Sequence, residues 1–161
     1  MPLQPESGRA CEGADLYRRI DHVAVAVHSL ESALKIYGAA MGFEKWHIEE
    51  IPEQKTRVAM LPIGESHIEL LEATDPESPV AAFLKKRGEG LHHICFEVED
   101  LELEIIRLKG AGVRLVNGGS RSGAGGRRIV FIHPSSTNGV LMELTQADVN
   151  QSPDTNSRRT T

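Results

Sequence analysis

The sequence predicts an α+β protein in which two tandem βαβββ modules form one curled mixed sheet around a metal site. Three observations predict this fold: a strand–helix pattern that occurs twice, a second pair of matched strands later in each copy, and paired histidine and glutamate positions. The 161 residues suffice for a single globular domain, and 40% of them are hydrophobic, enough to bury a core. The repeat is the strongest of the three observations, because repeated sequence indicates repeated structure.

Each module begins with a strand that leads into a helix. Residues 20–27 match residues 91–98 at a separation of 71 residues. Apolar residues then recur at helical spacing, and a glycine signal ends each helix. The apolar positions are Leu30, Ala33, Leu34 and Tyr37 in the first copy and Leu101, Ile105 and Leu108 in the second, with Gly42 after the first helix and Gly110 and Gly112 after the second.

The later strands of the modules match as well. Residues 57–62 match 128–134, and residues 67–70 match 141–144 at a separation of 74, because the second hairpin is longer. A short strand is expected before each hairpin, over 44–49 and 113–116.

These elements define the expected domain organisation. The Gly- and Ser-rich residues 117–128 are predicted to be a loop, and a short helix is predicted near 80–87 in the linker. Polar segments without periodicity are expected to be disordered. The boundaries are a disordered N-terminal lead-in over 1–19, a single domain over 20–146 (module one 20–72, linker 73–90, module two 91–146) and a disordered C-terminal tail over 147–161.

Composition excludes several classes of protein. A net charge of −5 argues against nucleic-acid binding, which needs a basic surface. No apolar run approaches the roughly 20 residues that span a membrane, and no apolar secretory segment is present. The two cysteines, Cys11 and Cys95, do not indicate a disulfide framework. We therefore expect a cytoplasmic protein, with the mitochondrial matrix as the alternative if the source is eukaryotic.

Four residues stand out as candidate metal ligands. Each module has a histidine on its first strand and a glutamate on its last, so that His22 pairs with Glu69 and His93 with Glu143. Two imidazoles and two carboxylates suit a divalent metal. Taken singly, each residue could equally be a structural histidine or a solvent-facing glutamate. Their recurrence at matched positions, with both glutamates in apolar strands, favours a metal site.

The other histidines are predicted to have smaller roles. His92 is adjacent to His93 and should point to the opposite face of its strand. His67 shares a face with Glu69 but has no counterpart in module two. Three more, near element ends, are expected to be solvated or structural, with a substrate contact as the alternative for the last: His28, His47 and His133.

At these residues the chain resembles the vicinal oxygen chelate superfamily, which includes glyoxalases, bleomycin resistance proteins and dioxygenases. Within it, the chain is most similar to methylmalonyl-CoA epimerases. The resemblance covers residues 20 to about 146. It is carried by residues 20–27, Pro52-Glu53-Gln54, 61–64, 68–72, 90–94, His133-Pro134 with Ser136, and 139–144.

The resemblance implies a glyoxalase-like fold and an activity in propionate metabolism. The implied reaction interconverts (R)- and (S)-methylmalonyl-CoA by α-proton abstraction through a metal-stabilised enolate. Separately from the resemblance, exposed sheet edges in this architecture favour a homodimer. The implied metal ligands are His22, His93 and Glu143, with Glu69 as the fourth, where some members carry glutamine. The cofactor is one divalent ion, with Co²⁺ favoured and Mn²⁺ or Zn²⁺ as alternatives. Glu143 is also the first candidate for the catalytic acid/base group.

Two features of the implied site stay open. Some bacterial epimerases carry a second glutamate on the strand after the Pro-Glu-Gln segment, and that position here is Val58. The second acid/base group is therefore Glu69, Glu97 or a water molecule. The CoA phosphates would meet one of two basic groups: Lys85, Lys86 and Arg87, or Arg121, Arg127 and Arg128.

Two other functions fit the same residues. Another superfamily metalloenzyme is one: a glyoxalase-type lyase, or an extradiol dioxygenase with two histidines and a carboxylate on iron. A non-catalytic protein that binds a small ligand is the other. The paired histidines and glutamates argue against simple sequestration, which does not require a metal.

Overall fold

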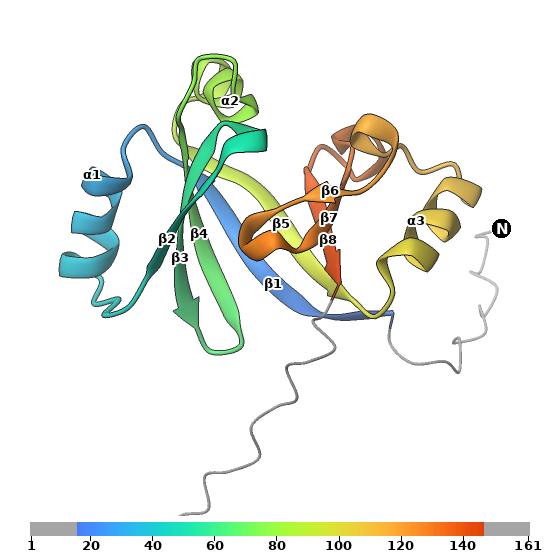
Figure 1. Ribbon diagram of the computed structural model, residues 1–161, viewed down its shortest axis with the longest axis horizontal. Coiled ribbons are helices and arrows are strands. Elements are labelled where there is room, and N and C mark those ends of the chain that lie inside the picture. Colours follow the sequence, from blue (N-terminus) through green and yellow to red (C-terminus); the bar gives the residue numbers. More distant parts are fainter. Residues whose placement is uncertain (1–15, 147–161) are drawn as a thin grey trace, which may run out of the picture.

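The two predicted modules form one continuous eight-stranded sheet. The computed structural model describes residues 16–146. Strand order in the sheet is β2-β3-β4-β1-β5-β8-β7-β6, so the first strands of the two modules lie side by side at its centre. The modules curl toward each other from this central pair (Figure 1). The α+β fold of two βαβββ modules is confirmed.

Module one occupies residues 17–73. Its helix begins at an N-cap, where the Ser29 side chain accepts a hydrogen bond from the Ser32 N–H, and it continues as a π-helical turn. The elements are β1 (Tyr17–Ala26), α1 (Leu30–Leu34), the π-helix (Lys35–Ala40), β2 (His47–Ile51), a 3₁₀ turn (Pro52–Gln54), β3 (Thr56–Ile63) and β4 (Ser66–Ala73).

Module two follows the linker helix α2 (Pro79–Arg87). Its own helix is capped by Asp100, whose side chain accepts from the Leu103 N–H. Three 3₁₀ turns lie at Val116–Gly118, Ala124–Gly126 and Pro134–Ser136. The main elements are β5 (Gly90–Val98), α3 (Leu101–Gly110), β6 (Arg121–Ser122), β7 (Arg128–Ile132) and β8 (Met142–Gln146).

The central strands pair in the way the repeat requires. β1 runs parallel to β4, β5 runs parallel to β8, and β1 and β5 are antiparallel to each other. The last strand of each module therefore lies beside its first strand. This pairing brings the histidine-bearing and glutamate-bearing strands of both modules to the middle of the sheet.

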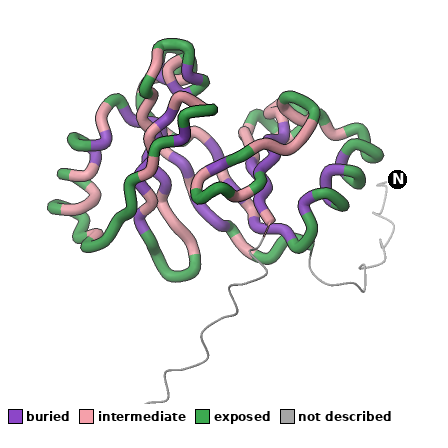
Figure 2. Tube along the Cα trace, viewed as in Figure 1, coloured by how far each residue is buried: buried purple, intermediate pink, exposed green. Residues whose placement is uncertain are grey.

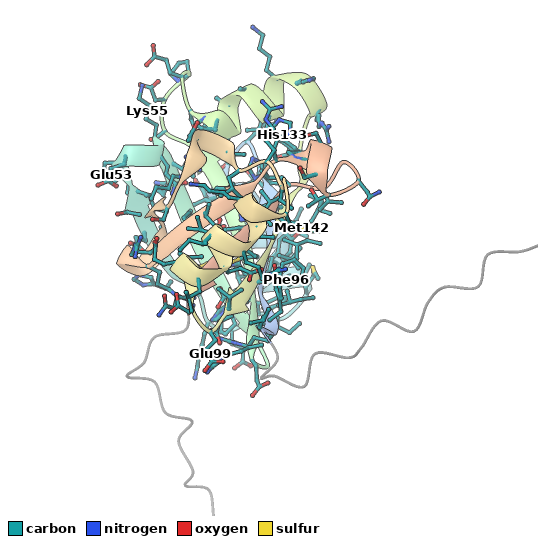
Figure 3. All side chains as sticks on the ribbon, turned by 90° about the vertical axis from the view of Figure 1, so that its right-hand side faces the viewer. Glu53, Lys55, Phe96, Glu99, His133 and Met142 are labelled. Carbon is teal, nitrogen blue, oxygen red and sulfur yellow. The ribbon has the colours of Figure 1, made fainter. Side chains whose placement is uncertain are left out.

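Helices α1 and α3 cover the outer face of the sheet, and α2 packs on one end of the inner face of module one, beside the cavity. Leu30 and Ala33 of α1 pack on β3 and β4, while Leu101 and Ile105 of α3 pack on β7 and β8. α2 closes the top of module one through Val80 and its neighbours. The buried residues follow these contacts along the strands (Figure 2). In a view onto module two, Phe96 and Met142 lie on the α3 side of the sheet (Figure 3).

Four details of the predicted elements were wrong. β1 begins at Tyr17, so residues 17–19 belong to the strand and not to the lead-in, because the Tyr17 hydroxyl bonds to Glu104 and Arg19 pairs with Glu97. The strand expected over 44–49 is β2, which starts later. In place of the strand expected over 113–116 there is a single bridge at Leu115, and the predicted loop contains β6. Residues 1–15 of the predicted lead-in, which include Cys11, and the predicted tail over 147–161 lie outside the described residues.

No helix in the described part of the chain is long and apolar enough to cross a lipid bilayer.

Candidate metal centre

Four side chains from four strands converge at the centre of the sheet. The Nε2 atoms of His22 on β1 and His93 on β5 lie 3.2 Å apart. Oε2 of Glu69 on β4 lies 3.5 Å from the first of these nitrogens and 3.8 Å from the second. Oε2 of Glu143 on β8 lies 3.1 Å from Nε2 of His93. The structure thus brings together all four residues singled out in the sequence, and all four are buried.

These separations match the spacing of ligands around one ion. Two atoms that each lie about 2.1 Å from a metal stand roughly 3.0 to 3.4 Å apart at octahedral or tetrahedral angles. The nitrogen–nitrogen and nitrogen–oxygen distances of 3.1 to 3.9 Å fall at or slightly above this spacing. Ligand atoms of His22, Glu69 and His93 all lie within 4.8 Å of one another, and Glu143 adjoins this group through His93, so the donor set of two imidazole nitrogens and two carboxylates suits a divalent cation in its chemistry.

The side chain that precedes each histidine in the sequence fixes the orientation of its ring. Nδ1 of His22 lies 2.8 Å from Oδ2 of Asp21, and Nδ1 of His93 lies 2.8 Å from Nδ1 of His92. Each ring therefore has its Nδ1 occupied and its Nε2 directed at the centre. A hydrogen bond at one ring nitrogen sets which nitrogen is free to bind a metal.

Two irregularities in the β1–β5 pairing place Asp21 and His92 beside these histidines. The register places Ile20 opposite Phe96 and His22 opposite Cys95, so Asp21 is an extra residue on β1. Farther along, the pairing slips by one residue at His92 on β5. An extra residue in a bulge breaks the strict alternation of side chains. For this reason the prediction that His92 faces away from His93 was wrong.

Asp21 also anchors an ionic network at the lower end of the site. Its Oδ1 accepts a hydrogen bond from Nη1 of Arg127 at 2.9 Å, while Nη2 of Arg127 reaches Glu97 at 3.4 Å. Arg19 pairs with Glu97 at 2.8 Å. Glu97 is therefore a salt-bridged structural carboxylate, and Arg127 is committed to this network instead of facing a phosphate.

The electrostatics of the centre suit a cation. Burial disfavours the charged form of His22, but the hydrogen bond to Asp21 and the charges of Glu69 and Glu143 outweigh it and raise the pKa of His22 to about 9. Burial raises the pKa of Glu69. Burial acts on Glu143 too, but the proximity of His93 overcomes it and lowers the pKa of Glu143. A cation bound here would replace protons as the charge that neutralises the carboxylates.

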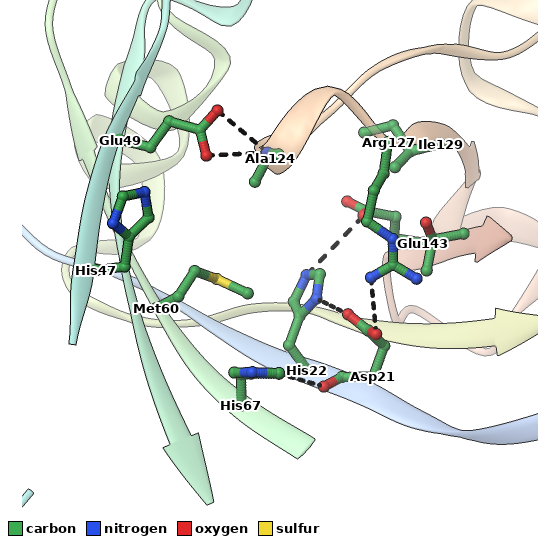
Figure 4. Close-up of a pocket in the computed structure, with 12 residues that line it drawn as sticks. Asp21, His22, His47, Glu49, Met60, His67, Ala124, Arg127, Ile129 and Glu143 are labelled. Atoms are coloured by element: carbon green, nitrogen blue, oxygen red, sulfur yellow. Dashed lines mark hydrogen bonds and ion pairs between the residues drawn. The ribbon is translucent and has the colours of Figure 1, made fainter. Parts of the chain in front are cut away.

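The larger cavity beside the centre has a volume of about 430 Å³ and separates the two modules' inner faces. His22 and Glu143 line one side of it, and His47, Glu49 and Met60 line the other (Figure 4). The remaining lining residues are Asp21, His67, Ala124, Gly125, Arg127, Ile129 and Thr145.

A smaller cavity of about 40 Å³ adjoins the same centre. Glu69, His93 and Glu143 line it, together with Val80 of α2. Arg121 lies here with its guanidinium 4.8 Å from the ring centroid of Phe131. Its Nε is buried without a hydrogen-bond partner among the described residues, and burial lowers the pKa of its guanidinium. Arg128, which the sequence grouped with Arg121, instead bonds to Glu102 at the surface.

Sequence reasoning missed Asp21, Glu49 and the inward placement of Arg121. Asp21 had a readable signal, since it immediately precedes His22 just as His92 precedes His93. Glu49 and Arg121 had none, because their positions depend on how β2 and β6 fold over the cavity.

Comparisons with known proteins agree with this fold. The sequence model of the glyoxalase/bleomycin resistance protein/dioxygenase superfamily matches residues 21–131. The ethylmalonyl-CoA/methylmalonyl-CoA epimerase of Cereibacter sphaeroides is 40% identical over 130 residues, which cover 80% of this chain and 97% of that protein. The mitochondrial methylmalonyl-CoA epimerase of Bos taurus is 38% identical, over 80% of this chain and 74% of its own.

Solved structures show the same likeness. A variant of the methylmalonyl-CoA epimerase of Streptomyces coelicolor, in complex with 2-nitronate-propionyl-CoA, superposes with a TM-score of 0.80 at 40% identity. It covers 85% of this chain and 99% of that one. A methylmalonyl-CoA epimerase in complex with methylmalonyl-CoA and NH₄⁺ gives the same TM-score, identity and coverage.

Proposed function

Because the chain belongs to the glyoxalase/bleomycin resistance protein/dioxygenase superfamily, we propose that it is a metal-dependent epimerase that interconverts (R)- and (S)-methylmalonyl-CoA. One observation carries the proposal: at matched positions of the repeat, two histidine nitrogens lie 3.2 Å apart beside a cavity, and two glutamate carboxylates each lie 3.1 to 3.9 Å from these nitrogens. The relatives named methylmalonyl-CoA epimerase supply the substrate class.

The proposed metal ligands are His22, Glu69, His93 and Glu143. A set of two nitrogens and two oxygens suits Co²⁺, Mn²⁺ or Zn²⁺, and we favour Co²⁺. When bound, the cation would act as a Lewis acid that stabilises negative charge on the thioester oxygen as the α-proton leaves. Asp21 and His92 would hold the two imidazole rings in the tautomer that this role requires.

Glu143 is the proposed acid/base group on one face of the substrate. It lines both cavities, so its carboxylate reaches the space on either side of the centre. The Cys95 thiol lies 3.4 Å from Oε1 of Glu143 and donates a hydrogen bond to it, which limits rotation of the carboxylate. A positioned carboxylate of this kind can accept a proton from an acidic carbon.

Arg121 is the proposed partner of the substrate carboxylate. Its guanidinium is half-buried beside the centre, and a desolvated arginine gains most from a planar anion that accepts two hydrogen bonds. The free carboxylate of a malonyl thioester is such an anion. The CoA phosphates lie at the far end of the pantetheine arm and would be bound elsewhere.

We also expect a homodimer in solution. β2 and β6 form the two edges of the sheet, and exposed sheet edges favour association. Light scattering coupled to size-exclusion chromatography measures this directly, and a monomer at micromolar concentration would contradict it.

Deuterium exchange tests the proposed reaction. The metal-loaded protein would be incubated in heavy water with one epimer of methylmalonyl-CoA, and NMR would follow deuterium at the α-carbon. We expect exchange that depends on added Co²⁺ and that His93→Ala abolishes. A folded, metal-loaded protein that produces no exchange would contradict the epimerase function.

A further inference from the structure

Epimerisation needs an acid/base group on each face of the α-carbon, and the site described so far supplies one. If Glu143 removes the proton from one face, another group must return a proton to the opposite face. This inference rests on the proposed function and concerns the identity of that second group.

We propose that Glu49 is the second acid/base residue. Three carboxylates among the described residues line the larger cavity: Asp21, Glu49 and Glu143. Asp21 is already committed to His22 and Arg127. Glu49 comes from the module one wall of the cavity and Glu143 from the module two wall, with Met60 and His22 between them (Figure 4).

The strand register directs Glu49 into the cavity. Glu49 pairs with Val58 across β2 and β3, and Glu50 pairs with Arg57. Cross-strand partners share a face of the sheet, and Val58 is buried on the inner face against α2. Val58 has no titratable group, so the carboxylate on this part of the inner wall belongs to its neighbour Glu49.

A backbone contact holds the Glu49 carboxylate over the cavity. The Gly125 N–H lies 2.9 and 3.1 Å from its two oxygens. Gly125 has φ +65, a conformation that favours glycine and turns this N–H toward β2. Gln54 makes a parallel contact from module one, because its Nε2 donates to the Ser122 carbonyl at 2.9 Å. The two contacts link module one to β6 and to the turn that follows it.

The proposed reaction balances with these two groups. The Cα–H bond breaks, its proton passes to the Glu143 carboxylate, and the electron pair moves into the thioester carbonyl to form an enolate. The protonated Glu49 then delivers its proton to the opposite face and forms a new Cα–H bond. The two glutamates have exchanged protonation states and return to the start through solvent. The reverse direction uses the same groups in the opposite roles.

Glu49→Gln separates exchange from epimerisation. Glutamine cannot transfer the proton, but its amide oxygen can still accept the hydrogen bond from Gly125. Each pure epimer would be incubated with the Co²⁺-loaded variant in heavy water. NMR would follow α-deuterium, and an assay that resolves the epimers would follow inversion. We expect epimerisation to fall by roughly 10²- to 10⁴-fold, while one epimer still exchanges its α-proton through Glu143.

Two companion variants complete the test. Glu50→Gln removes the next carboxylate of β2, which is exposed and points to the other face, and it should keep wild-type activity. Glu49→Asp keeps an acid of shorter reach and should retain part of the epimerisation lost in Glu49→Gln. Unfolding temperature and Co²⁺ affinity should match wild type in all three variants.

The possible contrary results are distinct. Epimerisation by Glu49→Gln at the wild-type rate would overturn the role of Glu49, and so would equal loss of exchange for both epimers. If the wild-type protein neither exchanges the α-proton nor interconverts the epimers, the proposed epimerase function is wrong, and the role of Glu49 is wrong with it.

Discussion

Asp21 and His92 occupy the same place in the two halves of the repeat, 71 residues apart, and each holds the Nδ1 atom of the histidine that follows it. The two contacts are equally short, at 2.8 Å. Their chemistry differs. Burial would raise the pKa of Asp21, but the hydrogen bonds and charges of His22 and Arg127 lower it below its usual range, so Asp21 is an anion. Burial lowers the pKa of His92 to about 4, so His92 is neutral. The same geometric role is filled by a charged acceptor in module one and by a neutral one in module two.

Asp21→Ala should weaken metal binding without removing a ligand. The His22 ring would lose the partner that fixes its tautomer, and loss of such a partner costs roughly 10- to 100-fold in metal affinity. Asp21→Asn retains an oxygen acceptor and should lose less. Competition with a chromophoric chelator measures the affinity, and ¹⁵N NMR of the metal-free protein reports the His22 tautomer. Wild-type affinity together with an unchanged tautomer in Asp21→Ala would show that Asp21 does not position His22.

Added Co²⁺ should raise the thermal stability of the protein. Ligand present at 100 times its Kd adds about 2.7 kcal/mol to a protein that binds it only when folded. For a chain of this length, 1 kcal/mol shifts Tm by about 2–4 °C, so a rise of roughly 5–10 °C is expected. Chelation should reverse it. Calorimetry with and without Co²⁺ measures the shift.

The control for this stabilisation lies on the same strand as a proposed ligand. His67 is two residues before Glu69 on β4 and lines the larger cavity, but it is not among the four converging residues. His67→Ala should keep the Co²⁺-dependent rise, and His93→Ala should lose it. An equal rise in both variants would mean that the ion binds elsewhere.

Arg121→Gln should raise KM more than it lowers kcat. Hydrogen bonds to charged groups contribute about 1.5–3 kcal/mol, which corresponds to roughly 10- to 150-fold in affinity. Inhibition by propionyl-CoA, which lacks the carboxylate, should not change. Arg128→Gln is the matched control, because Arg128 is exposed and bonds to Glu102. If Arg121→Gln weakened propionyl-CoA and methylmalonyl-CoA equally, the guanidinium would be recognising the shared CoA moiety instead.

The repeat predicted the central strands and the convergence of the four candidate ligands. His22 and His93 align at one separation and Glu69 and Glu143 at another, and the parallel pairing of first and last strands brings each pair together. This inference depends only on alternation along strands and on the symmetry of two copies. The helices were also readable, because their apolar spacing and caps are local signals.

The features that the sequence did not reveal are relations between distant segments. The bulges at Asp21 and His92 exist only in the pairing of β1 with β5. The bond between Arg127 and Asp21 joins residues 106 positions apart. β6 is two residues long, too short to give any periodic pattern. Long-range register and ion pairs of this kind require the folded chain.

Glu104 should stabilise the fold at neutral pH, and this stabilisation should be lost as the solution becomes acidic. It is buried at 3% exposure, accepts a hydrogen bond from the Tyr17 hydroxyl at 2.5 Å and is paired with Arg107 at 2.6 Å. The hydrogen bonds from Arg107 overcome the effect of burial and lower the pKa of Glu104. A carboxyl with a lowered folded-state pKa stabilises the native state above its unfolded value of about 4.3. That contribution is lost as the pH falls through the folded-state pKa.

Glu104→Gln should therefore reduce the free energy of unfolding by roughly 1–3 kcal/mol at pH 7. The difference from wild type should shrink as the pH falls below about 4.3, the unfolded-state pKa, and should vanish as the pH falls through the lowered folded-state pKa, where Glu104 becomes protonated and loses its charge interaction with Arg107. Urea unfolding across this pH range measures both effects. Glu102→Gln, on the exposed side of the same helix, should change stability by at most about 1 kcal/mol. A difference between Glu104→Gln and wild type that stays constant from pH 7 to pH 3 would show that packing around Glu104, and not its charge, anchors the start of β1 to α3.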